Sequence, residues 1–409
     1  MSSSEYTLAD SASFSSHNKG ARRIIFTLLQ KLQGGGLLLR EAGIGEIQFG
    51  DTQAPLQAEI EVYDPRVYRR ILLGGSIAGG ESYIDGYWSS PDLTRLLQLL
   101  ASNMQLVDKM EARLSWLTAP WHRLVHLLRD NSRRQARRNI AAHYDLGNSF
   151  YQQFLDSEML YSSALYSETE MTLEQAQQAK MRRLCQQLDL QPQDHLLEIG
   201  TGWGALAEFA AREYGCRVTT TTISQEQYVY AQQRIKQAGL EDRVTLLFED
   251  YRELTGQYDK LVSVEMIEAV GKRFLPLFIK RCQQLLKPKG KMVLQAITIT
   301  DQRYQQYSNN VDFIQRYVFP GGFLPSITAL CDTLTRHSDL VMCDLFDIGR
   351  DYARTLQQWR ERFEQNWPLL HKQGFDERFQ RQWRFYLCYC EAGFLARSIS
   401  TVQLSAERR

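Results

Sequence analysis

The second half of the chain alternates short apolar runs with segments of helical spacing. Strands are predicted at residues 196–199, 218–223, 244–248, 261–266 and 292–297. Helices are predicted at 225–238, 274–286, 352–365 and 377–395, and a last strand, antiparallel at the sheet edge, at 399–404. Strands and helices in alternation predict an α/β fold with a doubly wound, mainly parallel sheet.

The first hundred residues show a different pattern. Residues 1–20 are rich in serine and are predicted to be disordered. Beyond them the spacing predicts a basic amphipathic helix, two half-buried strands and two further helices, at 21–39, 46–49, 58–62, 64–73 and 92–100. The helix at 21–39 is expected to end at its glycine run, and the glycines at 74–86 indicate a loop. Residues 21–105 are therefore predicted to form a small α+β domain.

Residues 106–142 mix tryptophan and leucine with concentrated positive charge. Trp116 and Trp121 lie among basic residues, and four arginines follow at positions 133, 134, 137 and 138. Tryptophan and leucine beside charge of one sign are typical of a helix at the surface of an anionic bilayer. The alternative is a solvated linker between domains. We interpret this segment as a basic amphipathic linker that associates with the membrane.

The composition narrows the class of protein without defining it. Hydrophobic residues make up 44% and charged residues 23% of the chain, as in soluble globular proteins. The net charge of +1 gives no general attraction to nucleic acid. Seven cysteines show no metal-ligand spacing, so they are interpreted as reduced thiols of a cytoplasmic protein, and no metal is expected. Neither a signal peptide nor a membrane span is recognised.

The stretch from Asp194 to Ala211 reads as a buried strand, a glycine turn and a helix start. Gly200, Gly202 and Gly204 alternate through the turn, where the missing Cβ atoms allow a ligand to approach the backbone. Dinucleotide folds share this pattern but need an acidic residue about 20 positions later, which is absent here. The carboxylate is instead Glu198, inside the strand, as in the first motif of S-adenosylmethionine methyltransferases.

Candidate ligand-contacting residues follow the next three predicted strands, at the sheet edge where open α/β folds bind ligands. They are Thr222, Ile223 and Gln227 after the second strand, Asp250 and Tyr251 after the third, and Glu265 and Glu268 after the fourth. Ser224 is the expected N-cap of the helix at 225–238. Taken singly, each position could be a helix cap or a solvated loop. In this order, however, they favour a methyltransferase.

Several motifs in order resemble the cyclopropane-fatty-acyl-phospholipid synthase family, which includes the mycolic acid cyclopropane synthases. The resemblance covers nearly all of residues 40–400. Its motifs are His143–Asn148, Tyr161–Ser162, Glu198–Gly204, Thr222–Gln227, Asp250–Arg252, Val262–Glu268, Tyr317–Gly321, Leu324–Ser326 and Asp351–Leu356. The order of these motifs is more specific than any one of them.

The resemblance implies a Rossmann-like methyltransferase domain at 143–409 that uses S-adenosyl-L-methionine, preceded by a lipid-binding domain. Tyr144, Tyr161 and Ser162 would close over the methyl donor, while Gln227 and Asp250 would hold its ribose and adenine. The substrate would be the cis double bond of an unsaturated phospholipid acyl chain at the inner face of the cytoplasmic membrane. A homodimer is a further expectation.

In this family a bicarbonate ion serves as the base, held by a cysteine, a glutamate, a histidine, a tyrosine and a backbone amide. Glu268, Tyr352 and Ile297 match that pattern, but Ser163 stands at the cysteine position and Gln295 at the histidine position. Three outcomes remain open. Bicarbonate binds more weakly, Glu268 acts alone, or a different proton leaves and a methyl-branched or methylene chain forms instead of a cyclopropane.

Two other functions remain open on the residues alone. A small-molecule N-methyltransferase could share the catalytic domain, although a soluble amine needs neither the N-terminal domain nor the basic segment. A lipid-binding protein without catalysis is suggested by Ser163 and Gln295, although the motifs for the methyl donor are intact. An aromatic stretch at 313–323 could stabilise a cation on the acyl chain, with Phe313 itself expected in the core.

Overall fold

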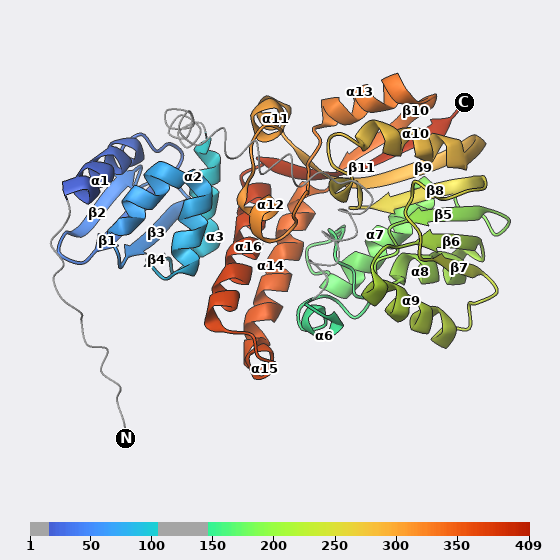
Figure 1. Cartoon of the computed structure of the whole chain (residues 1–409), viewed down its shortest axis with the longest axis horizontal. Coiled ribbons are helices and arrows are strands. Elements are labelled where there is room, and N and C mark those ends of the chain that lie inside the picture. Colours follow the sequence, from blue (N-terminus) through green and yellow to red (C-terminus); the bar gives the residue numbers. More distant parts are fainter. Residues whose placement is uncertain (1–15, 105–145) are drawn as a thin grey trace. The chain divides into compact units, whose positions relative to one another are not determined.

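The computed structural model describes residues 16–104 and 146–409. Contacts between Cα atoms divide the chain into two units (Figure 1): residues 1–92 with 103–115, and residues 93–102 with 116–409. The predicted basic linker and Tyr144 lie outside the described residues, as does most of the serine-rich N-terminus.

The first unit combines a small mixed sheet with two helices. Its sheet has the strand order β2-β1-β3-β4, in which β1 pairs antiparallel with β2 and parallel with β3. The strands are β1 (Gly36–Glu41), β2 (Gly45–Gly50), β3 (Gln57–Val62) and β4 (Trp88–Ser89), and the helices are α1 (Ser16–Leu29) and α2 (Arg66–Ile84). Alternate side chains such as Leu37, Leu39 and Phe49 are buried, which forms the core of this unit.

Two expectations for the first unit are wrong. The helix expected at 21–39 ends at Leu29, and Leu37–Leu39 belong to β1, where two of the three leucines are buried. The glycines at 74–80 do not form a loop, because α2 continues through them with a kink at Gly75 (φ 60°, ψ −148°). Burial of Ile77, Tyr83 and Ile84 along α2 outweighs the low helix propensity of the glycines.

The second unit contains the predicted doubly wound sheet. Seven strands have the order β10-β11-β9-β8-β5-β6-β7, and β5 to β9 run parallel. The strands are β5 (His195–Ile199), β6 (Arg217–Thr221), β7 (Val244–Leu247), β8 (Tyr258–Val264), β9 (Leu286–Ile299), β10 (Leu340–Asp347) and β11 (Ile399–Arg408). The predicted α/β class and parallel sheet are confirmed.

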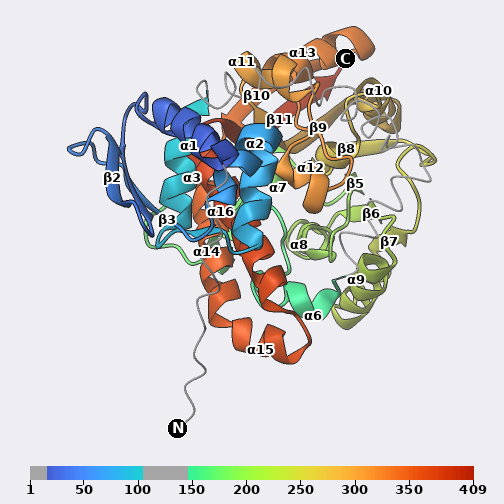
Figure 2. The same cartoon turned by 60° about the vertical axis from the view of Figure 1, so that its left-hand side comes forward.

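Helices cover both faces of this sheet (Figure 2). One hydrophobic cluster joins α7, α8 and α9 to Leu196, Val218 and Val262, and the other joins α10 and α13 to Leu197 and Leu261. Neighbouring strand residues therefore serve opposite faces, as a strand requires. The helices of this unit are α3 (Leu93–Ser102), α6 (Asn148–Tyr151), α7 (Leu173–Gln187), α8 (Ala205–Tyr214), α9 (Gln225–Gln237), η1 (Ile267–Ala269), α10 (Leu275–Leu285), α11 (Asp301–Tyr307), α12 (Phe313–Tyr317), α13 (Ile327–His337), α14 (Gly349–Gln365), α15 (Trp367–Lys372) and α16 (Glu377–Leu395).

The antiparallel end of the sheet differs from the prediction. Strand β11 lies between β9 and β10, so the edge strand is β10, which the pattern did not indicate. Most side chains of β10 are exposed, including Val341, Met342 and Phe346, so no buried alternation marks it as a strand. The strand predicted at 292–297 is longer than expected, because β9 runs from Leu286 to Ile299.

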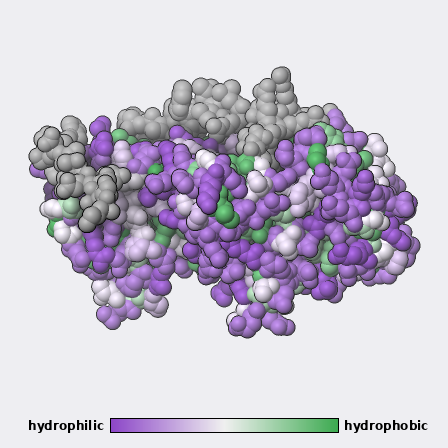
Figure 3. All heavy atoms as spheres, turned by 90° about the horizontal axis from the view of Figure 1, so that it is seen from below, coloured by the Kyte–Doolittle hydropathy of each residue, from purple (hydrophilic) through white to green (hydrophobic). Residues whose placement is uncertain are grey.

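Helix α3 belongs to the second unit. It packs on α16, and the Thr94 hydroxyl donates a 3.0 Å hydrogen bond to Glu391, which also pairs with Arg360. No helix among the described residues is long and apolar enough to cross a membrane. On the face shown in Figure 3, hydrophobic residues are scattered among hydrophilic ones.

Candidate active site

The glycine turn joins β5 to α8 in a backbone conformation that side chains disfavour. Gly200, Gly202 and Gly204 have φ values of 104°, 54° and 90°. A Cβ on Gly200 would lie 3.2 Å from Met266, whereas a Cβ on Gly202 would meet no atom within 4 Å. The turn thus leaves open space against bare backbone, which fits a ligand held close to the main chain.

Glu198 supports this turn from within the sheet. The Thr220 hydroxyl donates a 2.5 Å hydrogen bond to Glu198, and the Thr201 and Thr220 hydroxyls are 2.6 Å apart. Burial raises the pKa of Glu198 to about 8, so its carboxyl group is mostly protonated at neutral pH. In this geometry Glu198 links β5 through β6 to the glycine turn.

The residues expected to hold ribose and adenine lie at the ends of β6 and β7. Gln227 is buried and accepts a 2.9 Å hydrogen bond from Thr222, and Ser224 caps α9 as predicted. The Asp250 carboxylate forms a two-point pair with Arg252, with both N–O distances 2.7 Å. Ile223 follows β6, and Tyr251 packs on Phe278 of α10, with ring centroids 5.3 Å apart. We call this region, with Gly200–Gly204, the glycine-turn side.

Glu265, which received no catalytic role from the sequence, lies directly after β8. Glu265 has a φ of 48°, a left-handed conformation that is strained for a residue with a side chain. Its Oε1 accepts hydrogen bonds from the Ser163 amide (2.9 Å) and Gln295 Nε2 (2.8 Å), and its Oε2 accepts one from the Tyr352 hydroxyl (2.7 Å). Three of the residues expected to hold bicarbonate therefore hold Glu265, but Ser163 does so through its amide, because its hydroxyl donates a 3.0 Å hydrogen bond to the Ala164 carbonyl.

Glu268 takes the fourth of those groups. The Ile297 amide donates a 2.6 Å hydrogen bond to Glu268 Oε1, while Oε2 is buried and has no hydrogen-bond partner among the described residues. Burial, followed by the negative charge of Glu265, raises the pKa of Glu268 to about 8. At neutral pH Glu268 is mostly a neutral acid. Burial also raises the pKa of Glu265, but hydrogen bonds from Gln295, Ser163 and Tyr352 oppose that rise, so Glu265 is the better candidate for the ionised base.

Four groups form what we call the anion site: the amides of Ser163 and Ile297, Gln295 Nε2 and the Tyr352 hydroxyl. In this arrangement the anion site does not fit bicarbonate. Each group already donates to a carboxylate of the chain. The remaining amide oxygen of Gln295 accepts a 3.0 Å hydrogen bond from Gln403. We call the anion site together with Glu265 and Glu268 the carboxylate side.

Aromatic rings line the same region. Tyr352 stacks on Phe394 with centroids 4.6 Å apart, and the Tyr161 ring lies 5.2 Å from Trp359. The Tyr161 hydroxyl is 2.7 Å from that of Tyr386, so Tyr161 reaches α16. Phe313 is buried against α16, as expected for a core residue.

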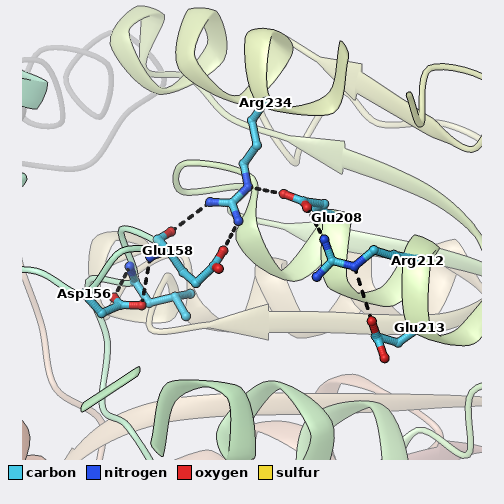
Figure 4. Close-up of polar contacts among 7 residues, drawn as sticks. Asp156, Glu158, Glu208, Arg212, Glu213 and Arg234 are labelled. Carbon is cyan, nitrogen blue, oxygen red and sulfur yellow. Dashed lines mark hydrogen bonds and ion pairs between the residues drawn. The ribbon is translucent and has the colours of Figure 1, made fainter. Parts of the chain in front are cut away.

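An ionic network holds the segment that leads to Ser162 and Ser163 (Figure 4). Arg234 of α9 pairs with Glu208 of α8 and with Glu158, and it also donates to the Glu158 carbonyl at 3.0 Å. Two residues earlier, Asp156 accepts the amides of Glu158 and Leu160 at 3.1 and 2.8 Å. These ion pairs therefore connect α8 and α9 to the segment that precedes Ser162 and Ser163.

A glycine turn at the carboxyl edge of a doubly wound sheet, with buried carboxylates after the fourth parallel strand, defines the class as an S-adenosylmethionine-dependent methyltransferase. A family model described as mycolic acid cyclopropane synthetase matches residues 131–404. The chain belongs to this family, and S-adenosylmethionine is its methyl donor.

Two curated relatives and one solved structure illustrate the similarity. Tuberculostearic acid methyltransferase UfaA1 of Mycobacterium tuberculosis is 44% identical over 336 residues, covering 80% of this chain and 77% of the relative. Cyclopropane-fatty-acyl-phospholipid synthase of Escherichia coli K12 is 37% identical over 376 residues, covering 91% and 92%. Mycolic acid cyclopropane synthase CmaA1 complexed with SAH and CTAB has a TM-score of 0.63 at 27% identity, covering 66% of this chain and 98% of that chain.

Proposed function

We propose that this chain methylates the cis double bond of unsaturated phospholipid acyl chains and that its main product is a methylated unsaturated chain rather than a cyclopropane. The relatives' names agree on lipid acyl chains and differ on the product. The relative at 44% identity is named a tuberculostearic acid methyltransferase and the one at 37% a cyclopropane synthase.

The observation that carries the proposal is the carboxylate of Glu265 inside the anion site. A free bicarbonate could diffuse in and adopt the position that suits proton removal from the new methyl group. Glu265 is instead tethered to β8, and hydrogen bonds from Ser163, Gln295 and Tyr352 fix both of its oxygens. The base is therefore a fixed part of the chain, in one position.

The position of the base decides how the reaction ends. The double bond attacks the methyl group of S-adenosylmethionine, the bond between sulfur and that methyl carbon breaks, and S-adenosylhomocysteine leaves. A cation then remains on the neighbouring chain carbon. If a proton leaves the new methyl group while a C–C bond closes, the product is a cyclopropane. If a proton leaves another carbon beside the cation, its C–H electrons form a new double bond and the methyl branch remains. In either case Glu265 accepts the proton, and the rings of Tyr161 and Tyr352 can face the cation.

Mass spectrometry of the lipid product tests this proposal. Purified protein is given S-adenosylmethionine and vesicles of monounsaturated phospholipid, with and without bicarbonate. Hydrogenation separates the two isomers of equal mass, because a methylated unsaturated chain takes up two hydrogens under conditions that leave a cyclopropane intact. The expected product takes up hydrogen, and its rate of formation does not depend on bicarbonate. A cyclopropane product with a bicarbonate-dependent rate would overturn the proposal.

We propose further that the first unit binds anionic membrane surfaces through α1. A groove of about 460 Å³ is lined by Lys19, Arg22, Arg23 and Phe26, among others, and Ile24 is 48% exposed beside it. Basic residues near an anionic surface contribute about 1 kcal/mol each, and salt screens this attraction. Membrane association through the arginines at positions 133, 134, 137 and 138 and the formation of a homodimer remain predictions.

Sedimentation with anionic vesicles tests the membrane proposal. Changing Lys19 and Arg23 to Ser should weaken binding at low salt and make little difference at high salt. The matched control changes two exposed lysines of the second unit, Lys236 and Lys372, to Ser and removes the same charge. Equal losses in both double variants would indicate a general charge effect and not a site on α1.

A further inference from the structure

Among the residues that the structure describes, one lysine is buried, and it lies beside the carboxylate side. Lys180 of α7 is 1% exposed, and its Nζ donates a 2.7 Å hydrogen bond to the Ser162 hydroxyl. One turn earlier on the same helix, Gln177 donates to the carbonyls of Leu160 and Ser162 at 3.3 and 3.1 Å. Helix α7 therefore holds the segment whose next amide, that of Ser163, binds Glu265.

A buried ammonium group requires nearby negative charge, because desolvation disfavours the charged form. Burial lowers the pKa of Lys180 to about 8, and the charges of Glu265 and Asp156 oppose that fall. The positive charge of Lys180 in turn opposes the rise that burial causes in the pKa of Glu265 and of Asp156. Lys180 thus interacts with two carboxylates, of which Glu265 belongs to the anion site.

We propose that Lys180 is a positioning residue that supplies the counter-charge of Glu265, keeps its carboxylate ionised and holds it in place through the Ser162–Ser163 peptide. The inference rests on the proposed function in so far as Glu265 is the base. The other titratable groups near Glu265 are Tyr352 of α14, whose hydroxyl donates to it, and Glu268 of η1, whose pKa is raised by the charge of Glu265.

Removing the charge of Lys180 should change the pH at which Glu265 becomes protonated. Without the ammonium group, burial still raises the pKa of Glu265 and one of the interactions that lower it is lost, so this pKa rises. The acid limb of the pH–rate profile should then move to higher pH by about one unit, the lower end of the effect of a neighbouring opposite charge. A purely structural role would lower the rate at every pH and leave the limb in place.

The experiment compares Lys180→Met with Gln177→Met in the full chain. Both variants remove a buried contact of α7 with residues 160–162, but only Lys180→Met removes a charge. The rate of methyl transfer to monounsaturated vesicles is measured from pH 6 to pH 9 at saturating methyl donor. We expect a shifted acid limb for Lys180→Met only, and a limb near that of the wild type for Lys180→Arg. Equal limbs in all variants would overturn the proposal.

A second measurement does not depend on activity, so it remains informative if a variant is poorly active. It also tests this inference separately from the proposed function. Unfolding in urea is compared for wild type, Lys180→Met, Glu265→Gln and the double variant. If the two charges interact, Lys180→Met should lower the unfolding midpoint less when Glu265 is already neutral. An equal decrease in both backgrounds would show that the charges are not coupled, whichever product the wild type makes. Full activity of Glu265→Gln would instead contradict the proposed base alone.

Discussion

The glycine-turn side and the carboxylate side lie at the ends of neighbouring parallel strands, yet they are built differently. At the first, backbone conformation does most of the work, with Gly200, Gly202 and Gly204 all at positive φ. At the second, the Ser163 amide and the side chains of Gln295 and Tyr352, from three separate segments, meet at Glu265. A local turn is enough for the proposed methyl-donor site, whereas the proposed base depends on long-range contacts.

The largest expected effect comes from removing the charge of the base. Glu265→Gln should lower kcat by about 10²–10⁴-fold, the usual contribution of a positioned base. Affinity for the methyl donor, measured by calorimetry, should not change, because the glycine turn is untouched.

Glu268→Gln is the matched control for this variant. Glu268 is mostly protonated at neutral pH, so its replacement by a neutral amide changes the charge of the site little. The loss in kcat should therefore be smaller than for Glu265→Gln. If Glu268→Gln were the more damaging variant, the assignment of the base to Glu265 would be wrong.

On the glycine-turn side, the change Gly202→Val should affect the affinity for the methyl donor. A Val side chain at Gly202 would project into open space where the donor is expected and would strain a residue at φ 54°. Donor affinity should fall by at least about tenfold, or about 1.4 kcal/mol. Gly239→Val provides the control, since Gly239 also has open space and a positive φ of 65° but lies at the end of α9. Comparable losses in both variants would point to strain in the backbone alone.

Glu265→Gly offers a test by chemical rescue. The change removes the carboxylate, suits the left-handed φ of 48°, and leaves the groups that Glu265 occupied without an acceptor. Added bicarbonate or acetate should then restore part of the lost rate, on the order of tenfold for one or two recovered hydrogen bonds. No response of Glu265→Gly to either anion would mean that the anion site cannot hold a free base.

The last prediction concerns Glu198 and protein stability, where no effect on the reaction itself is involved. Its pKa is about 8 in the folded protein against an ordinary value of 4.5, so the folded state binds this proton more tightly. Its contribution is therefore complete below pH 4.5 and is lost as the pH rises towards 8, by at most about 1.4 kcal/mol per pH unit. Urea unfolding at pH 5, 6.5 and 8 should show a weaker pH dependence in Glu198→Gln. An identical dependence would mean that Glu198 does not titrate in this range.

Much of this protein follows from local sequence. The alternation of strands and helices, the glycine turn and the N-cap at Ser224 depend on neighbouring residues, so the sequence alone predicted the parallel sheet and the methyltransferase class. The pattern failed where tertiary packing outweighs propensity. Helix α2 runs through its glycines because its apolar face is buried, and β10 lies at the sheet edge with mostly exposed side chains.

Glu265, the proposed base, stood out in the sequence only as one of two acids after the strand that is now β8. Its partners Ser163, Gln295 and Tyr352 are 102, 30 and 87 positions away, so no local pattern encodes their meeting. By itself the sequence predicted the fold, because a fold of this class follows from periodicity. The order of its motifs indicated the family, and local glycine spacing indicated the turn proposed to bind the methyl donor. Only the tertiary structure decided that Glu265 occupies the anion site, because that depends on where distant strands and helices bring their side chains together.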